Sequence, residues 1–267
     1  MKIRRQLCFD VGNTDVYGAV LQGDALLMDF RRSNRSRPTA DEFGVFLIQL
    51  LRTHGIEPGA IDEVAVACVV PDSLRSIVDA CEKYLERPVL VLETGVKTGL
   101  KIRVKDPREV GADRIANAMA AVELFPGENL IVIDMGTATT FCAVNARREY
   151  LGGAIAAGLS LSMHALGAGT AKLPVVDILR PAAALGRTTV ENIQAGLFFG
   201  HVGLVREMVA RLREEAFGGE PARVIGTGGM ARLFADLDLF DSIEPTLVLR
   251  GLQRAITLNR RPTIPTL

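Results

Sequence analysis

The segment Asp10-Val11-Gly12-Asn13-Thr14 lies between two apolar runs, at residues 5–10 and 16–21, and a third apolar run follows at 25–30. Glycine and asparagine between such runs are typical of tight turns that join neighbouring strands. The first thirty residues are therefore predicted to form three consecutive strands, with an acidic side chain at the end of the first.

The same order returns at Asp134-Met135-Gly136-Thr137-Ala138-Thr139-Thr140, directly after another apolar run. Two more strands are predicted behind it, at residues 141–145 and 149–155. A strand that ends in Asp-x-Gly and leads a hairpin thus occurs twice, which indicates two related α/β halves rather than a short solenoid repeat. We expect one domain at residues 1–115 and the other at residues 116–267.

The rest of the chain alternates helix and strand patterns. Thr39 and Glu42 have the spacing of a capping box at the start of the first helix. Apolar residues then recur at helical spacing in several segments. The predicted helices lie at residues 43–54, 72–85, 107–122 and 189–215, and the further strands at residues 64–70 and 88–92.

The turn at residues 10–14 carries groups suited to a phosphate. Backbone N–H groups of a glycine-bearing turn can approach a phosphate closely, and Thr14 and Asn13 add a hydroxyl and an amide. Asp10, at the strand end, is placed to hold Mg²⁺ or its waters. An ordinary hairpin turn is the alternative, because Asp, Gly and Asn are common there. The second copy at residues 134–140, with three hydroxyl side chains, favours two turns that grip a nucleotide across a cleft.

A third glycine turn, Gly226-Thr227-Gly228-Gly229, follows a strand, and a helix is predicted to begin behind it. Without side chains, Gly228 and Gly229 can lie against an adenine or a ribose, and a helix N-terminus favours anions. The ordered set of three turns resembles the actin, sugar-kinase and heat-shock ATPase superfamily. That resemblance implies an α/β fold of two duplicated ribonuclease-H-like domains, each a mixed sheet flanked by helices, with the nucleotide cleft between them.

Gly111-Ala112-Asp113-Arg114 places a carboxylate beside a guanidinium. In phosphoryl transfer Asp113 can accept the proton of an attacking hydroxyl, and Arg114 can hold an anionic substrate or the transferring phosphoryl group. The alternative is a surface pair of charges on a helix.

Composition excludes several other functions. The 31 basic and 31 acidic residues give a formal net charge of +0, so no basic field points to nucleic acid. No apolar stretch is long enough for a membrane span, and the basic start lacks the apolar region of a signal peptide. The four cysteines and three histidines are scattered, which disfavours a zinc site or a disulfide framework. We therefore expect a cytoplasmic protein.

Three motifs, at residues 10–14, 111–114 and 134–140, resemble the signatures of type III pantothenate kinases. The resemblance implies ATP-dependent phosphorylation of pantothenate to 4'-phosphopantothenate, the first step of coenzyme A biosynthesis, by a homodimer that requires potassium or ammonium. Shorter matches in the same register are Thr39-Ala40-Asp41-Glu42, Leu151-Gly152-Gly153-Ala154-Ile155, Ala171-Lys172-Leu173-Pro174 and Gly186-Arg187-Thr188-Thr189-Val190.

The same resemblance implies a role for each site residue. Asp113 would accept the proton, Asp134 would bind the monovalent cation, and Asp10 would hold magnesium. The phosphate loop would comprise Asp10, Val11, Gly12, Asn13, Thr14, Asp15, Val16 and Tyr17, with Gly136, Thr137, Gly228 and Gly229 as further ATP contacts. Pantothenate would contact Gly111, Ala112, Asp113, Arg114 and Thr189, with Val104 beside it.

Several positions depart from the family pattern, among them Val104 where tyrosine is usual, Cys142 and His164 where aspartate is frequent, and Ala157 where proline is frequent. The departures leave the proposed base in place. They motivate two alternatives, a nucleotide-binding paralogue with a regulatory role and weakened turnover, and a kinase for another small hydroxy acid.

Overall fold

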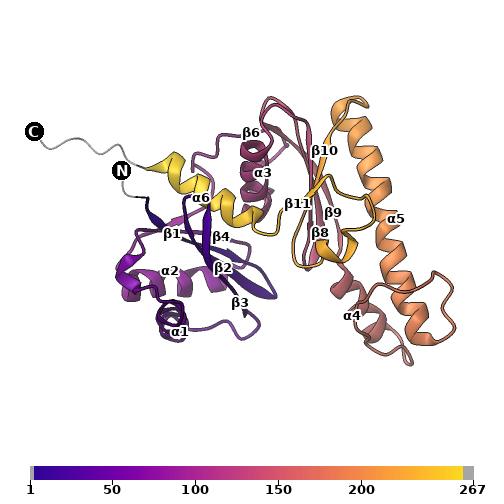
Figure 1. The fold of residues 1–267 in the computed structure, drawn as a ribbon, viewed down its shortest axis with the longest axis horizontal. Helices are drawn as coiled ribbons and strands as arrows, with labels where there is room; N and C mark the ends of the chain where they lie inside the picture. The colour runs from indigo at the N-terminus through magenta and orange to yellow at the C-terminus, as the bar shows by residue number, and fades with distance from the viewer. Residues whose placement is uncertain (1–2, 261–267) are drawn as a thin grey trace, which may run out of the picture. The chain divides into compact units, whose positions relative to one another are not determined.

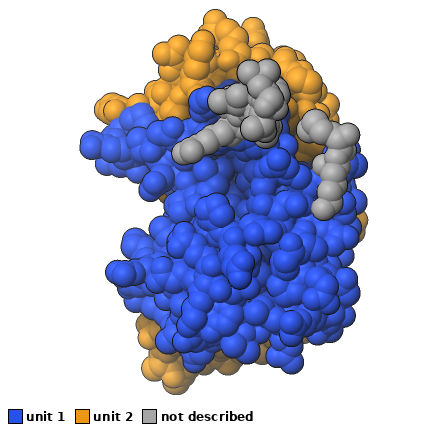
Figure 2. All heavy atoms as spheres, turned by 90° about the vertical axis from the view of Figure 1, so that its left-hand side faces the viewer, with its two compact units in different colours: residues 1–99, 106–120, 247–267 blue, residues 100–105, 121–246 orange. Residues whose placement is uncertain are grey.

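The computed structural model describes residues 3–260, and the chain divides into two compact units, which Figure 2 colours separately. Unit 1 takes in residues 3–99, 106–120 and 247–260, and unit 2 takes in residues 100–105 and 121–246. These units differ from the continuous ranges expected from the sequence because a C-terminal helix packs on the N-terminal sheet. The assignment of functional domains to residues 1–115 and 116–267 stays a prediction.

Unit 1 contains a five-stranded sheet whose first three strands form an antiparallel meander (Figure 1). Two parallel strands follow beside the first strand, so the order is β3-β2-β1-β4-β5. The strands are β1 (Arg5–Val11), β2 (Asp15–Gln22), β3 (Ala25–Ser33), β4 (Glu63–Cys68) and β5 (Val89–Val91).

Helices cover the sheet of unit 1. Alternate side chains of β1, among them Leu7 and Phe9, join the apolar core formed with α1 (Ala40–Thr53) and α2 (Pro71–Leu85), as the period of two along a strand requires. The capping box predicted at the start of α1 is present, with Thr39 and Glu42 bonded reciprocally. The third α-helix, α3 (Ala112–Leu124), begins in unit 1 and follows a 3-10 turn at Pro107–Glu109. The α-helix therefore begins five residues later than predicted.

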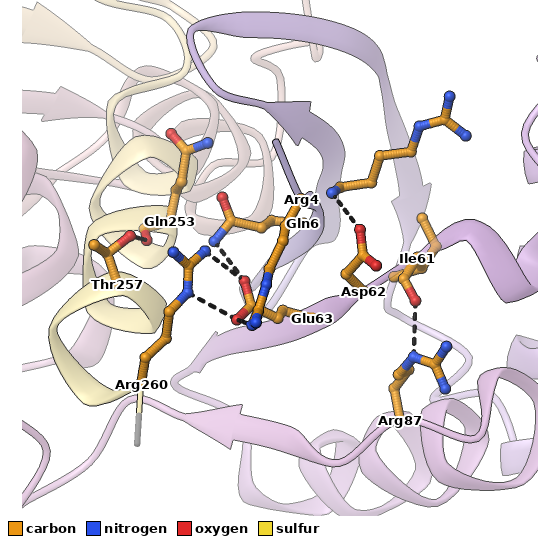
Figure 3. A network of polar contacts seen from close by, with 10 residues as sticks. Arg4, Gln6, Ile61, Asp62, Glu63, Arg87, Gln253, Thr257 and Arg260 are labelled. Atoms are coloured by element: carbon orange, nitrogen blue, oxygen red, sulfur yellow. Dashed lines mark hydrogen bonds and ion pairs between the residues drawn. The ribbon is translucent and has the colours of Figure 1, made fainter. Parts of the chain in front are cut away.

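The C-terminal helix α6 (Leu247–Asn259) packs against β1 and β4 of unit 1. A polar network at its end joins three parts of this unit (Figure 3). Glu63, at the start of β4, accepts hydrogen bonds from Arg260 at 2.7 and 2.8 Å and from Arg4 at 2.6 Å. Gln6 of β1 donates to the same carboxylate at 3.1 Å. The carboxylate therefore ties the end of α6 to the sheet.

Unit 2 repeats the sheet of unit 1. An antiparallel meander of three strands again leads, a parallel strand lies beside its first strand, and the order is β11-β10-β7-β8-β9-β6 (Figure 1). The strands are β6 (Lys101–Ile102), β7 (Leu130–Met135), β8 (Ala138–Val144), β9 (Glu149–Ala157), β10 (Arg223–Thr227) and β11 (Ser242–Ile243).

Two helices pack on unit 2, α4 (Leu159–Gly169) and the long α5 (Thr189–Phe217). Thr188 and Glu191 form a capping box at the start of α5, which fixes where that helix begins. Phe198 of α5 stacks on Phe234 at 4.9 Å between ring centroids, within the apolar core of this unit. The segment that holds Phe234, Ala231–Phe234, is a 3-10 turn, whereas the sequence predicted the start of a helix after the third glycine turn.

The repeat predicted from the two Asp-x-Gly segments is confirmed by the shared strand order and by the strand register. Asp10 is the penultimate residue of β1 and pairs with Tyr17, while Asp134 is the penultimate residue of β7 and pairs with Thr140. None of the helices in residues 3–260 combines the length and apolar character that a membrane span needs.

Candidate active site

The first turn, residues 12–14, joins β1 to β2 directly after Asp10 and Val11. The backbone N–H of Gly12 donates to the carbonyl of Asp15 at 2.9 Å, which closes the turn. A Cβ at Gly12 would lie 3.3 Å from that carbonyl oxygen, so the absence of a side chain relieves a close contact here. Asn13, at the tip, is exposed, and its backbone is accessible to a ligand.

A buried asparagine that the sequence did not reveal holds the first turn from behind. Asn34 follows β3 and is 2% exposed. Its side-chain amide donates to the carbonyl of Gly12 at 2.8 Å, and its backbone N–H donates to the carbonyl of Thr14 at 2.8 Å. Ser73, also buried near the start of α2, donates its hydroxyl to Asn34 Oδ1 at 3.1 Å. Both ends of the turn are thus bonded to one residue.

The second turn, residues 136–137, joins β7 to β8 after Asp134 and Met135. Gly136 donates its N–H to the carbonyl of Ala138 at 3.1 Å, and Thr137 is exposed. This turn is one residue shorter than the first. Asp134 nevertheless has the same position in β7 that Asp10 has in β1.

Backbone, rather than a side chain, packs around the second turn. Gly158, the N-cap of α4, donates its N–H to the carbonyl of Thr137 at 3.1 Å, and a Cβ there would overlap the carbonyl oxygens of Gly136 and Thr137. Gly228 has φ +85°, and a Cβ there would overlap Asp134 Oδ1 and lie 2.7 Å from backbone atoms of Met135. Only glycine fits either position. The third glycine turn therefore lies against the second turn in unit 2.

Thr139, which pairs with Met135 next to the second turn, contacts a buried histidine. Thr139 of β8 and His201 of α5 are both almost fully buried, and the Thr139 hydroxyl lies 2.9 Å from His201 Nε2. Burial lowers the pKa of His201 below its usual 6.5, because the apolar surroundings disfavour the charged ring. His201 is therefore neutral at physiological pH.

Asp113 stands in the first turn of α3 in unit 1. Burial raises the pKa of its carboxyl above the usual 3.8, while the backbone N–H and the charge of Arg114 oppose that shift. Asp113 Oδ1 is buried and has no hydrogen-bond partner among the described residues. A partly desolvated carboxylate with an unused oxygen is a good proton acceptor.

The other residues predicted for the site lie in varied surroundings. Val11, Val16 and Tyr17 are buried in the sheet of unit 1, and the Tyr17 hydroxyl donates to Asp29 at 3.2 Å. Their side chains belong to the core, so only their backbone is suited to a ligand. Gly111 lies against the Asp113 carboxylate, and Gly229 is exposed behind Gly228.

Thr189 lies in unit 2, on the rim of a groove of about 800 Å³. The groove runs between α4 and α5 and is mostly apolar, with His201 at its base. Val104, of the same unit, lies near Gly152 of β9. Two of the positions that depart from the family pattern differ in exposure. Cys142 is buried, and its sulfur accepts a hydrogen bond from the Tyr150 hydroxyl at 3.4 Å, whereas His164 is exposed.

The described residues hold no group of three or more His, Cys, Asp or Glu that could bind a metal on their own. Magnesium is usually held by one or two carboxylates together with substrate phosphates and water. The carboxylate of Asp10 lies at the end of β1, beside the first turn.

These features define a class of protein. A repeated mixed sheet, with an aspartate and a tight turn at the end of the leading strand in each unit, is the actin-like fold. Two solved structures share the fold. A putative 2-dehydro-3-deoxygalactonokinase from Sinorhizobium meliloti has TM-score 0.61 at 13% identity, over 94% of this chain and 98% of that one. MreB5 of Spiroplasma citri, bound to ADP, has TM-score 0.50 at 10% identity, over 96% and 97%.

Sequence comparison narrows the class. The family model for type III pantothenate kinase matches residues 6–211. A type III pantothenate kinase of Legionella pneumophila (strain Corby) is 46% identical over 95% of this chain and 98% of its own length. The chain belongs to the type III pantothenate kinase family.

Proposed function

We propose that this protein transfers the γ-phosphoryl group of ATP to pantothenate, yielding 4'-phosphopantothenate and ADP, in the first step of coenzyme A biosynthesis. The observation that carries the proposal is the 46% identity to a type III pantothenate kinase over almost the whole of both chains. Asp113 and the two turns, which the reaction needs, are all present in this chain.

Asp113 is the proton acceptor of the proposed reaction. The oxygen of the pantothenate primary hydroxyl attacks the γ-phosphorus, the bond from that phosphorus to the bridging oxygen breaks, and ADP leaves with that electron pair. The hydroxyl proton passes to the Asp113 carboxylate. Its raised pKa supports this role, because a carboxylate that is more basic than usual accepts a proton more readily.

The proposed pantothenate contacts begin with the segment that holds this base. Arg114 pairs with the carboxylate of pantothenate, and the backbone at Gly111 and Ala112 adds contacts. Thr189 and Val104 are further proposed contacts. Val104 lacks the hydroxyl and ring of a tyrosine, so we expect a looser pocket on that side.

ATP binds through backbone N–H groups. The segment from Asp10 to Tyr17 holds its phosphates, Gly136 and Thr137 add donors, and Gly228 with Gly229 contacts the adenosine. Magnesium would neutralise charge on the phosphates, and Asp10 would hold it or its waters. Asp134 would hold a monovalent cation, potassium or ammonium.

We further propose a cytoplasmic homodimer. Most of the exposed large apolar side chains of the described residues fall within residues 155–199 of unit 2, where a second copy can cover them. They are Ile155, Leu161, Leu166, Val175, Leu179, Leu185, Val190 and Phe199.

The test is a coupled ADP-release assay with ATP, Mg²⁺ and potassium, with and without pantothenate. We expect ADP release that requires pantothenate and falls when sodium replaces potassium. ATP binding without pantothenate-dependent release would contradict the proposed reaction. Release that is equal in sodium would contradict the cation role of Asp134 alone. Analytical ultracentrifugation tests the dimer, which a monomer at micromolar concentration would refute.

A further inference from the structure

We propose that Asn34 is a positioning residue for ATP, which orients the peptide between Gly12 and Asn13 so that its N–H faces the phosphates, and that Ser73 holds Asn34 in place. The inference rests on the proposed function, in which the first turn binds the phosphates of ATP. It adds two residues to the site, and neither lies in the sequence motifs.

The orientation follows from peptide geometry. The described residues contain no cis peptide bond, and in a trans peptide the C=O and N–H point in opposite directions. Because the Gly12 carbonyl accepts from the buried Asn34 amide at 2.8 Å, the N–H of Asn13 points to the other side of the turn. Asn13 is exposed, and in the proposal its N–H on that side faces the phosphates of ATP.

Both ends of the turn are fixed by the same residue. The carbonyl of Thr14 accepts from the Asn34 backbone N–H at 2.8 Å, and the carbonyl of Gly12 accepts from its side chain. A turn of three residues bonded at both ends cannot easily flip its first peptide, since the flip would leave the buried Asn34 amide without its acceptor. Unsatisfied buried groups cost free energy, so the observed orientation is strongly preferred.

Ser73 completes the arrangement. Its hydroxyl donates to Asn34 Oδ1 at 3.1 Å, and both side chains are at most 2% exposed. The Gly12 carbonyl can only accept, so the amide nitrogen of Asn34 faces it, and Oδ1 faces Ser73, whose hydroxyl donates and holds the side chain in place. The carbonyl of Gly12 therefore meets a donor, as the turn requires.

The experiment measures Mg²⁺–ATP affinity directly, by calorimetry, for the wild type, Asn34→Ala and Ser73→Ala. We expect a loss of about tenfold for Asn34→Ala, equal to one hydrogen bond of about 1.4 kcal/mol, and about threefold for Ser73→Ala. In the coupled assay the KM for ATP rises while the KM for pantothenate stays within about twofold, which a general loss of structure would not produce.

Asn145→Ala is the matched control. Asn145 braces the β8–β9 turn through bonds to Glu149 and Arg147, at the end of β8 away from Gly136. We expect ATP affinity within about twofold of wild type for this variant. A folded Asn34→Ala variant with wild-type ATP affinity, or an Asn145→Ala variant with an equal loss, overturns the proposal.

Two further outcomes are decisive. If Asn34→Ala does not fold, Ser73→Ala decides alone, and unchanged ATP affinity in that variant contradicts the proposal. If the wild type binds ATP but does not phosphorylate pantothenate, the function fails while the calorimetric comparison still tests Asn34.

Discussion

The two turns hold an aspartate at the same place in a strand but are supported in different ways. In unit 1 the support is a polar side chain, Asn34, bonded to both ends of the turn. In unit 2 it is backbone packed against backbone at Gly158 and Gly228, which have no room for a Cβ. A duplicated fold thus keeps its strand register while the packing behind each turn diverges. Of the four predictions below, those at Gly158 and His201 compare the two turns directly.

The largest effect concerns Asp113, because neither turn supplies a base. We expect Asp113→Asn to lower kcat by about 100-fold or more while ATP affinity stays nearly intact. The same change relieves the burial of a charge, so the melting temperature stays equal or rises. Because burial raises the pKa of Asp113 above 3.8, we expect kcat/KM of the wild type to fall at acid pH with a midpoint above 3.8. Turnover within tenfold of wild type would remove Asp113 from the role of base.

The next prediction compares the turns directly. Gly158→Ala forces a Cβ into two carbonyl oxygens of the second turn, and we expect a loss of about 2 kcal/mol in the free energy of unfolding. Gly12→Ala meets only a contact at 3.3 Å in the first turn, and we expect less than about 0.5 kcal/mol. Urea unfolding of both variants gives the comparison. Equal losses would show that the two turns are supported alike.

The sequence predicted the turns but not their supports. Short apolar runs that end in Asp-x-Gly locate β1 and β7, because this signal depends on local sequence alone. Asn34 lies in a polar stretch between Arg32 and Arg35, where nothing marks it until β3 brings it behind the first turn. Gly158 gives no signal either, since its packing depends on the placement of α4. A polar residue directly after a strand of a meander is the one hint that sequence offers.

Helix α6 was not predicted, and the reason is similar. Its apolar residues have helical spacing, among them Val248, Leu252 and Ala255, but its place in unit 1 depends on contacts with β1 and β4, far away in sequence. The continuous domain ranges followed from reading the chain in order. The role of Asp113 as base stays a prediction, although the structure places Asp113 in the first turn of a helix, where burial raises the pKa of its carboxyl.

A third prediction concerns the parallel strand in each unit. Glu63 starts β4 with 14% of its side chain exposed, whereas the pair Arg223–Glu128 at the start of β10 is more open. We expect Glu63→Gln to cost about 1–2 kcal/mol and Glu128→Gln less than about 0.5 kcal/mol in urea unfolding. Similar losses for both would refute the assignment of a stronger tie to unit 1 (Figure 3).

The pH dependence of that tie follows from the Glu63 pKa. Burial raises it, but the hydrogen bonds and charges of Arg260 and Arg4 outweigh burial and bring the pKa below 4.5. A depressed folded-state pKa contributes stability that is present above 4.5 and lost as pH falls through the folded-state value. We expect Glu63→Gln to lose less stability than the wild type as pH falls through this range, measured by urea unfolding. An equal loss in both proteins would assign the effect to other carboxylates.

The smallest effect is expected at the residue pair behind each turn. Val16 pairs with Val11 in unit 1, and at the same place in unit 2 Thr139 pairs with Met135 and bonds to buried His201. The folded-state pKa of His201 is depressed, so the unfolded chain binds more protons below pH 6.5 and stability falls as pH drops from 6.5 towards the folded-state value. Unit 1 has no titratable group at this position. We therefore expect wild type to lose up to about 1 kcal/mol between pH 7.5 and 5.5, and His201→Gln to lose less over the same range. An equal loss in both proteins, by urea unfolding at the two pH values, would place the titrating group elsewhere and leave the two turns alike in their response to acid.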